Sequence, residues 1–105
     1  MTNEVLQVEE YRIVQMLSQP GIDAMILLST QEKPGVWYRV YFEPNRTEPH
    51  FYPSGQGLII LMNSRHYERM VDLLRNESPV YLHTYSTGVT LSSRMEPVGE
   101  GELQP

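Results

Sequence analysis

Cysteine is absent from this chain of 105 residues, and lysine occurs once, as Lys33. Without cysteine there is no disulfide, no thiolate nucleophile and no cysteine-ligated zinc site. The simplest expectation is a reducing cytoplasm, of a bacterium or of a virus's host cell, although a chain without cysteine suits any compartment. The other basic residues are all arginines, which favour bidentate and interfacial contacts over non-specific electrostatic attraction at the surface.

Long hydrophobic runs are also missing. No apolar run approaches the ~18 residues that a membrane-spanning helix needs. Residues 1–10 lack both the basic segment and the apolar core of a signal peptide. We therefore expect no membrane association. A chain of this length is expected to fold as a single domain over residues 1–105, around one core.

The net charge of -5 arises near the two ends of the chain. We expect an ordered body over about residues 8–96 with acidic tails at both ends, and residues 11–95, between the acidic ends, carry a charge of about +1. The negative charge disfavours nucleic acid as a partner, since contacts to phosphate usually dominate that affinity. The acidic residues of the two ends are Glu4, Glu9, Glu10, Glu96, Glu100 and Glu102.

Apolar residues at helical spacing predict a first helix over residues 8–18. Ile13 lies four residues before Leu17 on the expected apolar stripe. A Pro-Gly pair at residues 20–21 would then end the helix.

The next two segments predict a hairpin. Residues 22–30 are apolar enough for a buried strand, and a Lys-Pro-Gly turn leads into a second strand over residues 36–43. Side chains of the second strand alternate between two faces. One face carries Val36, Tyr38, Val40 and Phe42, and the other carries Trp37, Arg39 and Tyr41.

A long loop over residues 44–56 precedes a third strand over residues 57–62. Residues 64–75 then predict a second helix that packs on the sheet through one apolar stripe. A final hairpin over residues 80–85 and 89–95 follows. The stripe consists of Tyr67, Met70, Val71 and Leu74, and the hairpin gathers Tyr81, His83 and Tyr85 on one face.

These elements predict an α+β fold. It begins with an N-terminal helix and continues as a five-stranded, mainly antiparallel sheet, strongly bent or closed into a small barrel, with the second helix between strands 3 and 4. This order is similar to that of Sm and Sm-like proteins, in which the second helix would be the variable insertion. Met62 and Asn63 resemble the Met-Asn pair of the family's first motif, although Ile59 stands where the family has Asp. Thr87 and Gly88 stand in place of the Arg-Gly of the second motif. The resemblance implies a protein that binds single-stranded RNA.

No pattern for catalysis, metal binding or cofactor binding stands out. The three histidines, His50, His66 and His83, lie at no recognised metal-ligand spacing. Ser54 is not in a nucleophile elbow, and no phosphate-binding glycine loop is present. We therefore expect no enzyme, no cofactor and no metal, while an enzyme with an unrecognised site is a third alternative.

Aromatic residues close to arginine supply the one functional signal. The candidate interaction surface consists of Trp37, Arg39 and Tyr41, or of Tyr81, His83 and Tyr85. Such residues dominate protein interfaces, stack RNA bases on exposed sheets, or pair across strands within one sheet. We expect a small non-enzymatic domain that forms a homo-oligomer or binds a protein partner. Sm-like binding of single-stranded RNA is the alternative.

Overall fold

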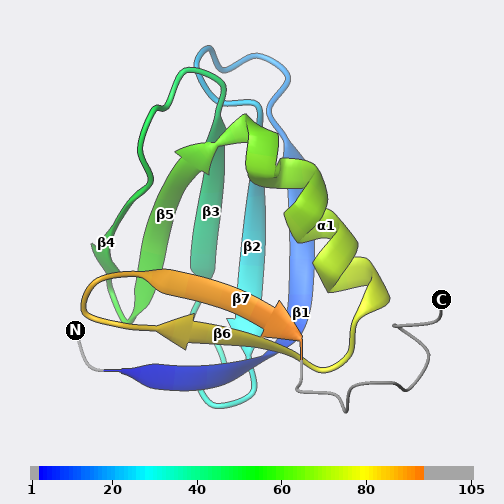
Figure 1. The fold of residues 1–105 in the computed structure, drawn as a ribbon, viewed down its shortest axis with the longest axis vertical. Helices are drawn as coiled ribbons and strands as arrows, with labels where there is room; N and C mark the ends of the chain where they lie inside the picture. The colour runs from blue at the N-terminus through cyan, green and yellow to red at the C-terminus, as the bar shows by residue number, and fades with distance from the viewer. Residues whose placement is uncertain (1–2, 94–105) are drawn as a thin grey trace, which may run out of the picture.

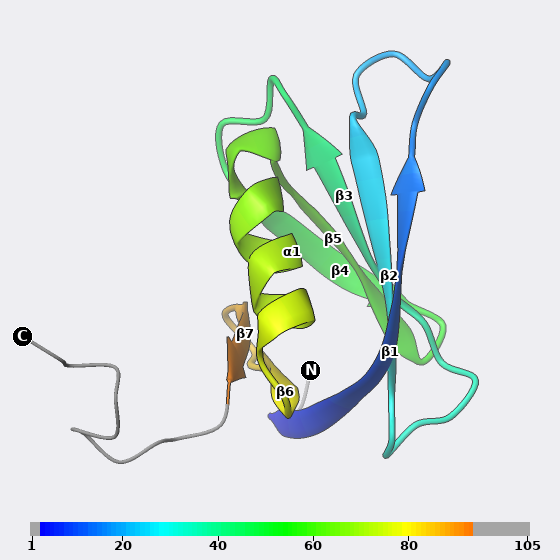
Figure 2. The same cartoon turned by 90° about the vertical axis from the view of Figure 1, so that its right-hand side faces the viewer.

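A computed structural model describes residues 3–93 and arranges them as one bent sheet with a helix on its inner side (Figures 1 and 2). The strand order is β4-β5-β3-β2-β1-β6-β7, and every neighbouring pair is antiparallel except β3 and β5. The strands are β1 (Glu4–Gln15), β2 (Ala24–Thr30), β3 (Tyr38–Glu43), β4 (His50–Ser54), β5 (Gly57–Asn63), β6 (Val80–Thr84) and β7 (Val89–Ser93). The helices in this part of the chain are a short 3-10 turn, η1 (Ser64–His66), and α1 (Tyr67–Asn76).

Strand β1 turns the corner of the sheet. Its first residues, Glu4 to Gln7, pair with β6, and its later residues pair with β2. A bulge between Val8 and Glu10 interrupts the register at this corner, and bulges bend a strand and strengthen its twist. The sheet therefore curls into a half-barrel, in which the β6–β7 hairpin runs across the other strands near their lower ends (Figure 1).

The predicted N-terminal helix over residues 8–18 is wrong, because most of this segment belongs to strand β1. The bulge supplies the reason. It lets Val8 and Tyr11, three residues apart, both pack against the core. A spacing of three imitates a helical stripe, although each half of the strand alternates with a period of two. Leu17, which completed the predicted stripe, lies beyond the strand and is 90% exposed.

The predicted five-stranded, mainly antiparallel Sm-like order is also wrong. The sheet has seven strands and is mixed, and α1 lies between β5 and β6. Within the segment predicted as a loop, β4 forms an edge strand against β5. Strand β5 lies between β4 and β3 and runs parallel to β3. The resemblance to Sm-like proteins relied on the predicted order and stays a hypothesis.

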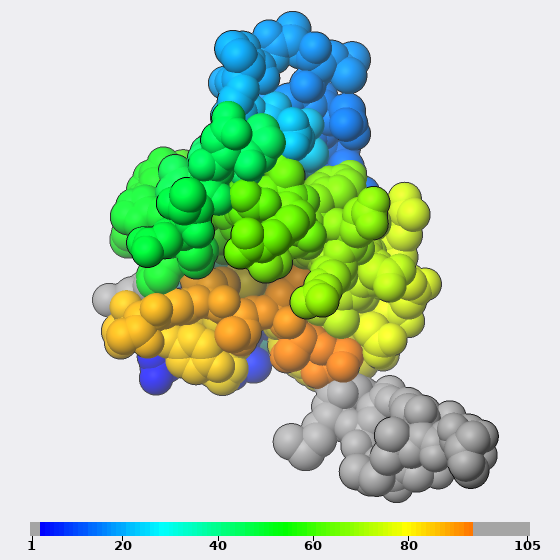
Figure 3. Space-filling view, turned by 45° about the horizontal axis from the view of Figure 1, so that its top comes forward, coloured from blue at the N-terminus to red at the C-terminus, as the bar shows by residue number. Residues whose placement is uncertain are grey.

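The core lies between the inner face of the sheet and α1. The predicted apolar stripe of the helix is confirmed, because Val71 and Leu74 are buried and Tyr67 and Met70 pack against the core. Tyr67 meets Phe42 edge to face, with ring centroids 5.2 Å apart. On this side of the molecule, α1 fills the space between the loop before β4 and the β6–β7 hairpin (Figure 3). The inner face of the sheet is therefore covered.

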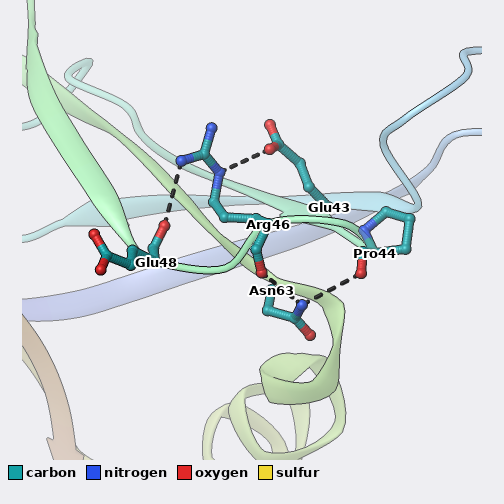
Figure 4. Close-up of polar contacts among 5 residues, drawn as sticks. All are labelled: Glu43, Pro44, Arg46, Glu48 and Asn63. Carbon is teal, nitrogen blue, oxygen red and sulfur yellow. Dashed lines mark hydrogen bonds and ion pairs between the residues drawn. The ribbon is translucent and has the colours of Figure 1, made fainter.

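Asn63, at the end of β5, fixes the loop that joins β3 to β4 (Figure 4). Its side-chain nitrogen donates to the carbonyl oxygens of Pro44, at 3.3 Å, and Arg46, at 2.8 Å. Its side-chain oxygen accepts from the backbone N–H of Arg65 at 2.8 Å and so caps η1. Arg46 in turn pairs with Glu43 at 2.7 Å. One side chain thus ties the long loop to the start of the helix.

The N-terminal acidic segment belongs to the sheet. Residues before position 8 were expected to form a tail, but Leu6 is 3% exposed and lies in the core. The backbone from Glu4 onward pairs with β6. The predicted acidic tail at the C-terminus lies outside the described residues.

Candidate functional site

The outer face of the sheet, on the side opposite α1, carries the predicted residues Trp37, Arg39 and Tyr41. They lie on β3 or just before it and alternate with inward-facing side chains that are almost fully buried. Gly57 lets β5 begin directly against this strand, because a Cβ at position 57 would collide with the Trp37 carbonyl oxygen. The alternation predicted for this strand is therefore present in the structure.

Two rows of side chains cross the outer face over five strands. Residues paired across neighbouring strands share a face, so the strand registers define the rows. Most members of the rows are apolar, and no helix covers this side of β1 to β5 within residues 3–93 (Figure 2). The first row comprises Arg12, Leu27, Arg39, Ile59 and Tyr52, and the second comprises Val14, Met25, Tyr41, Leu61 and His50.

Charged groups collect at one place on the outer face. Arg12 and Arg39 flank Leu27 on adjacent strands. Neither guanidinium has a hydrogen bond or an ion pair to any described residue. Together with Glu10 and Trp37, they line a shallow hollow of about 490 Å³. This part of the face therefore combines two unpaired guanidinium groups of the described chain, a carboxylate and an indole that is 42% exposed.

The second predicted set, Tyr81, His83 and Tyr85, lies on the β6–β7 hairpin and not beside the first set. Tyr81 and His83 alternate with the buried Leu82 on β6. His83 and Tyr85 stack with ring centroids 4.3 Å apart, and the Tyr85 hydroxyl is 3.1 Å from Nδ1 of His83. Strands β1 and β2 separate this hairpin from β3. The structure does not combine the two sets into one patch.

A polar pocket that the sequence analysis missed lies at one end of the core. Its outer part is the ion pair between Lys33 Nζ and Glu4 Oε1, 2.9 Å apart, whose side chains are 30% and 32% exposed. Its inner part includes Tyr38 and Thr84, which are 1% and 2% exposed. By distance and angle, neither hydroxyl has a hydrogen bond within residues 3–93, but the Tyr38 hydroxyl lies close enough to the Lys33 ammonium to interact with it electrostatically. The pocket has a volume of about 270 Å³.

Two pKa values in this pocket are shifted. The hydrogen bond to Glu4 raises the pKa of Lys33 above its ordinary value. Burial raises the pKa of Tyr38, although the nearby ammonium of Lys33 acts in the opposite direction. At neutral pH the pocket therefore holds a neutral phenol next to an ion pair whose net charge is zero.

Sequence reasoning missed this pocket because its parts come from distant segments. Tyr38 was placed only on the strand face opposite Trp37, and Glu4 only in a tail. The available signal was a hydroxyl at an inward position of a strand. Thr84 alternates with half-buried positions on β6 just as the buried Leu82 does, and a buried hydroxyl normally requires a partner.

The histidines do not converge on a site. His50 lies on β4, His66 in η1 and His83 on β6, and no three potential metal ligands cluster in the part of the chain that the structure describes. The helices of residues 3–93 are too short or too polar to cross a bilayer. Comparison of the chain with protein-family models, curated proteins and solved structures finds no match. Within residues 3–93, the outer face and the polar pocket are therefore the two features whose chemistry suits binding.

Proposed function

We propose that this domain binds a second copy of itself through the outer face of its sheet. The observation that supports the proposal is the apolar character of a sheet face that α1 does not cover. An antiparallel sheet that faces water on one side normally carries polar side chains there, whereas the two outer rows are mainly apolar. Exposed apolar patches rimmed by polar residues are typical of protein interfaces.

The charges of the outer face favour a second copy as the partner. A two-fold contact brings the same surface of both copies together. Arg12 and Arg39 of one copy can then meet Glu10 of the other, so that the unpaired guanidinium groups gain partners. Trp37 and Tyr52, which are 42% and 41% exposed, supply aromatic side chains of the kind that dominate such interfaces.

The size of the outer face sets the expected affinity. Five strands at about 4.8 Å spacing, with three outward positions on each, span roughly 20 by 20 Å, or about 400 Å². A standard interface buries about 800 Å² on each partner. We therefore expect a weak and reversible dimer that forms at micromolar concentrations or above.

Sedimentation equilibrium over a range of protein concentrations tests this proposal. Leu61→Lys puts a charge into the second row and should weaken dimerisation by about tenfold or more, because an unpaired charge in an interface is costly. Leu17→Lys is the matched control. It adds the same charge at an isolated apolar residue that is 90% exposed in the β1–β2 loop, and it should leave the dimer unchanged.

A wild-type protein that stays monomeric at high micromolar concentration would contradict self-association. If Leu61→Lys and Leu17→Lys weaken dimerisation equally, the dimer does not form through the outer face. If the monomer instead binds a labelled single-stranded oligonucleotide in a salt-dependent manner, and Arg39→Ala removes that binding, then the same face binds RNA.

A further inference from the structure

We propose that the pocket formed by Glu4, Lys33, Tyr38 and Thr84 binds a small neutral polyhydroxylated molecule, in the size range from glycerol to a monosaccharide. The pocket opens at the end of the core and lies on the inner side of the sheet. It shares none of the residues of the two outer rows. The proposal is therefore independent of self-association.

Two buried hydroxyls give the site its chemistry. Tyr38 comes from β3 and Thr84 from β6, on the two halves of the bent sheet, and both line the pocket. Each is at most 2% exposed, and neither hydroxyl has a hydrogen-bond partner in the part of the chain that the structure describes. A polar group buried without a hydrogen bond is costly, so such groups normally have a partner. A ligand with its own hydroxyls supplies these partners.

The charge balance of the pocket selects a neutral ligand. Lys33 and Glu4 form a 2.9 Å ion pair and cancel each other's charge. A charged ligand would leave a net charge in this part-buried pocket, whether or not the pair opens to admit it. A hydroxyl group both donates and accepts. A diol can therefore bond to a buried hydroxyl on one side and to the ammonium or the carboxylate on the other.

The dimensions of the pocket select a small ligand. Its volume of about 270 Å³ lies below the ~300–1,000 Å³ that is typical of sites for drug-sized molecules. Part of the wall comes from the turn between β4 and β5. There Gln56 adds a side-chain amide, and Gly55 and Gly57 leave backbone groups without side-chain cover. Amide and backbone groups of this kind orient polar ligands.

The ion pair controls access to the hydroxyls. The hydroxyl oxygens of Tyr38 and Thr84 are almost inaccessible to solvent, whereas the Lys33 and Glu4 side chains are partly exposed. A ligand therefore reaches the hydroxyls when the Lys33 side chain swings outward. The pair is part-buried and not fully buried, so opening it costs less than breaking a fully buried ion pair.

Two-dimensional ¹H–¹⁵N NMR titrations of the full chain with glycerol and with D-glucose test the proposal. We expect saturable shifts at millimolar probe concentrations, confined to the amides around Lys33, Thr84 and the β4–β5 turn. Tyr38→Phe and Thr84→Val each remove one hydroxyl with little change of shape. Each should weaken binding by about tenfold, as expected for the loss of one hydrogen bond.

Matched controls make the same chemical changes outside the pocket. Tyr67→Phe on α1 and Thr90→Val on β7 should bind both polyols as the wild-type protein does. Melting temperatures show whether the pocket variants are still stably folded. Tyr38→Phe and Thr84→Val should melt at or above the wild-type temperature, because each removes a buried hydroxyl that has no partner within residues 3–93.

Four results would overturn the proposal. In the first two, neither polyol produces a saturable shift, or the Tyr38→Phe and Thr84→Val variants bind as tightly as the wild-type protein. Saturable shifts with sodium acetate but with neither polyol would mark an anion site instead. A fall in melting temperature in both variants would be equally decisive, since it would show that the hydroxyls are already bonded within the protein.

Discussion

Single residues constrain strand β5 at both of its ends. At its start, Gly57 leaves room for the carbonyl oxygen of Trp37, which a Cβ would strike. At its end, Asn63 bonds to the β3–β4 loop and to the first turn of the helix. Hairpin turns fix the register of antiparallel neighbours, but β3 and β5 are parallel and share no such turn. These two residues therefore help to hold a pairing that no local turn specifies.

The Asn63→Ala variant should lower the free energy of unfolding by about 1–2 kcal/mol. Loss of a helix cap costs ~1 kcal/mol, and the released carbonyls of the loop regain only part of their hydrogen bonding from water. Urea denaturation measures the change. Asn76→Ala is the control, because the Asn76 side chain makes an exposed bond to Asp72, and its effect should stay within ~0.5 kcal/mol. Equal effects of the two variants would show that Asn63 does not anchor the loop.

Strand β1 joins the two halves of the half-barrel. It is 12 residues long and pairs with β6 before its bulge and with β2 after it. The inward residues change phase at the bulge, so that Leu6 packs into the core on one side of the corner and Tyr11 packs against it on the other. The hairpin β6–β7 is attached to the larger part of the sheet through this one strand.

The Leu6→Ala variant should therefore destabilise the protein by about 2–5 kcal/mol, as expected for a buried large-to-small change. Leu6 is 3% exposed, whereas its neighbour Val5 is 56% exposed on the opposite face of the same strand. Val5→Ala is the matched control, with an expected change within ~0.5 kcal/mol. Denaturation curves for both variants provide the measurement. Similar small changes would mean that the N-terminal part of β1 is the dispensable tail that the sequence had led us to expect.

For the protein as a whole, the half-barrel creates two unlike surfaces. The inner face is covered by α1 and by the β6–β7 hairpin, and its open end is closed by the Lys33–Glu4 ion pair over buried hydroxyls. The outer face of β1 to β5 presents mainly apolar rows. A domain usually buries both apolar faces of a sheet within two or three layers. Self-association would supply the missing outer layer, while the pocket remains on the inner side.

Stability should fall at alkaline pH. The folded-state pKa values of Lys33 and Tyr38 lie above their ordinary values, so the folded protein holds these protons more tightly than the unfolded chain does. Their contribution to stability is complete below the unfolded pKa values of ~10. It is lost as the pH rises through the higher folded-state values. Free energies of unfolding from urea titrations between about pH 8 and about pH 11 measure this loss.

The Tyr38→Phe variant separates the two contributions to this pH dependence. It retains the Lys33–Glu4 ion pair but lacks the phenol whose pKa burial raises. Its free energy of unfolding should therefore fall less steeply above about pH 10 than that of the wild-type protein. Identical slopes would show that Tyr38 does not contribute to the alkaline loss of stability.

Local sequence pattern was sufficient for most of the elements after residue 22. The β2–β3 hairpin, strand β5, the amphipathic helix and the β6–β7 hairpin lie close to their predicted positions. Each is encoded within a few neighbouring residues. The Lys-Pro-Gly turn places Gly35 at φ 81, which glycine adopts readily, and strand alternation separates Trp37 and Arg39 from Tyr38. The same alternation correctly indicated which candidate side chains share a strand face.

Only tertiary contacts determine that the first element is a strand, that β3 and β5 pair in parallel, and that the polar pocket forms. The spacing of apolar residues shows which positions face the core, and the bulge in β1 changed this spacing to one that resembles a helix. The spacing does not show which strands pair, so no local pattern indicated that β5 lies between β3 and β4. Glu4 and Thr84 meet because β1 bends back onto β6. Such contacts join segments that are distant in sequence, and their geometry exists only once the chain has folded around its core.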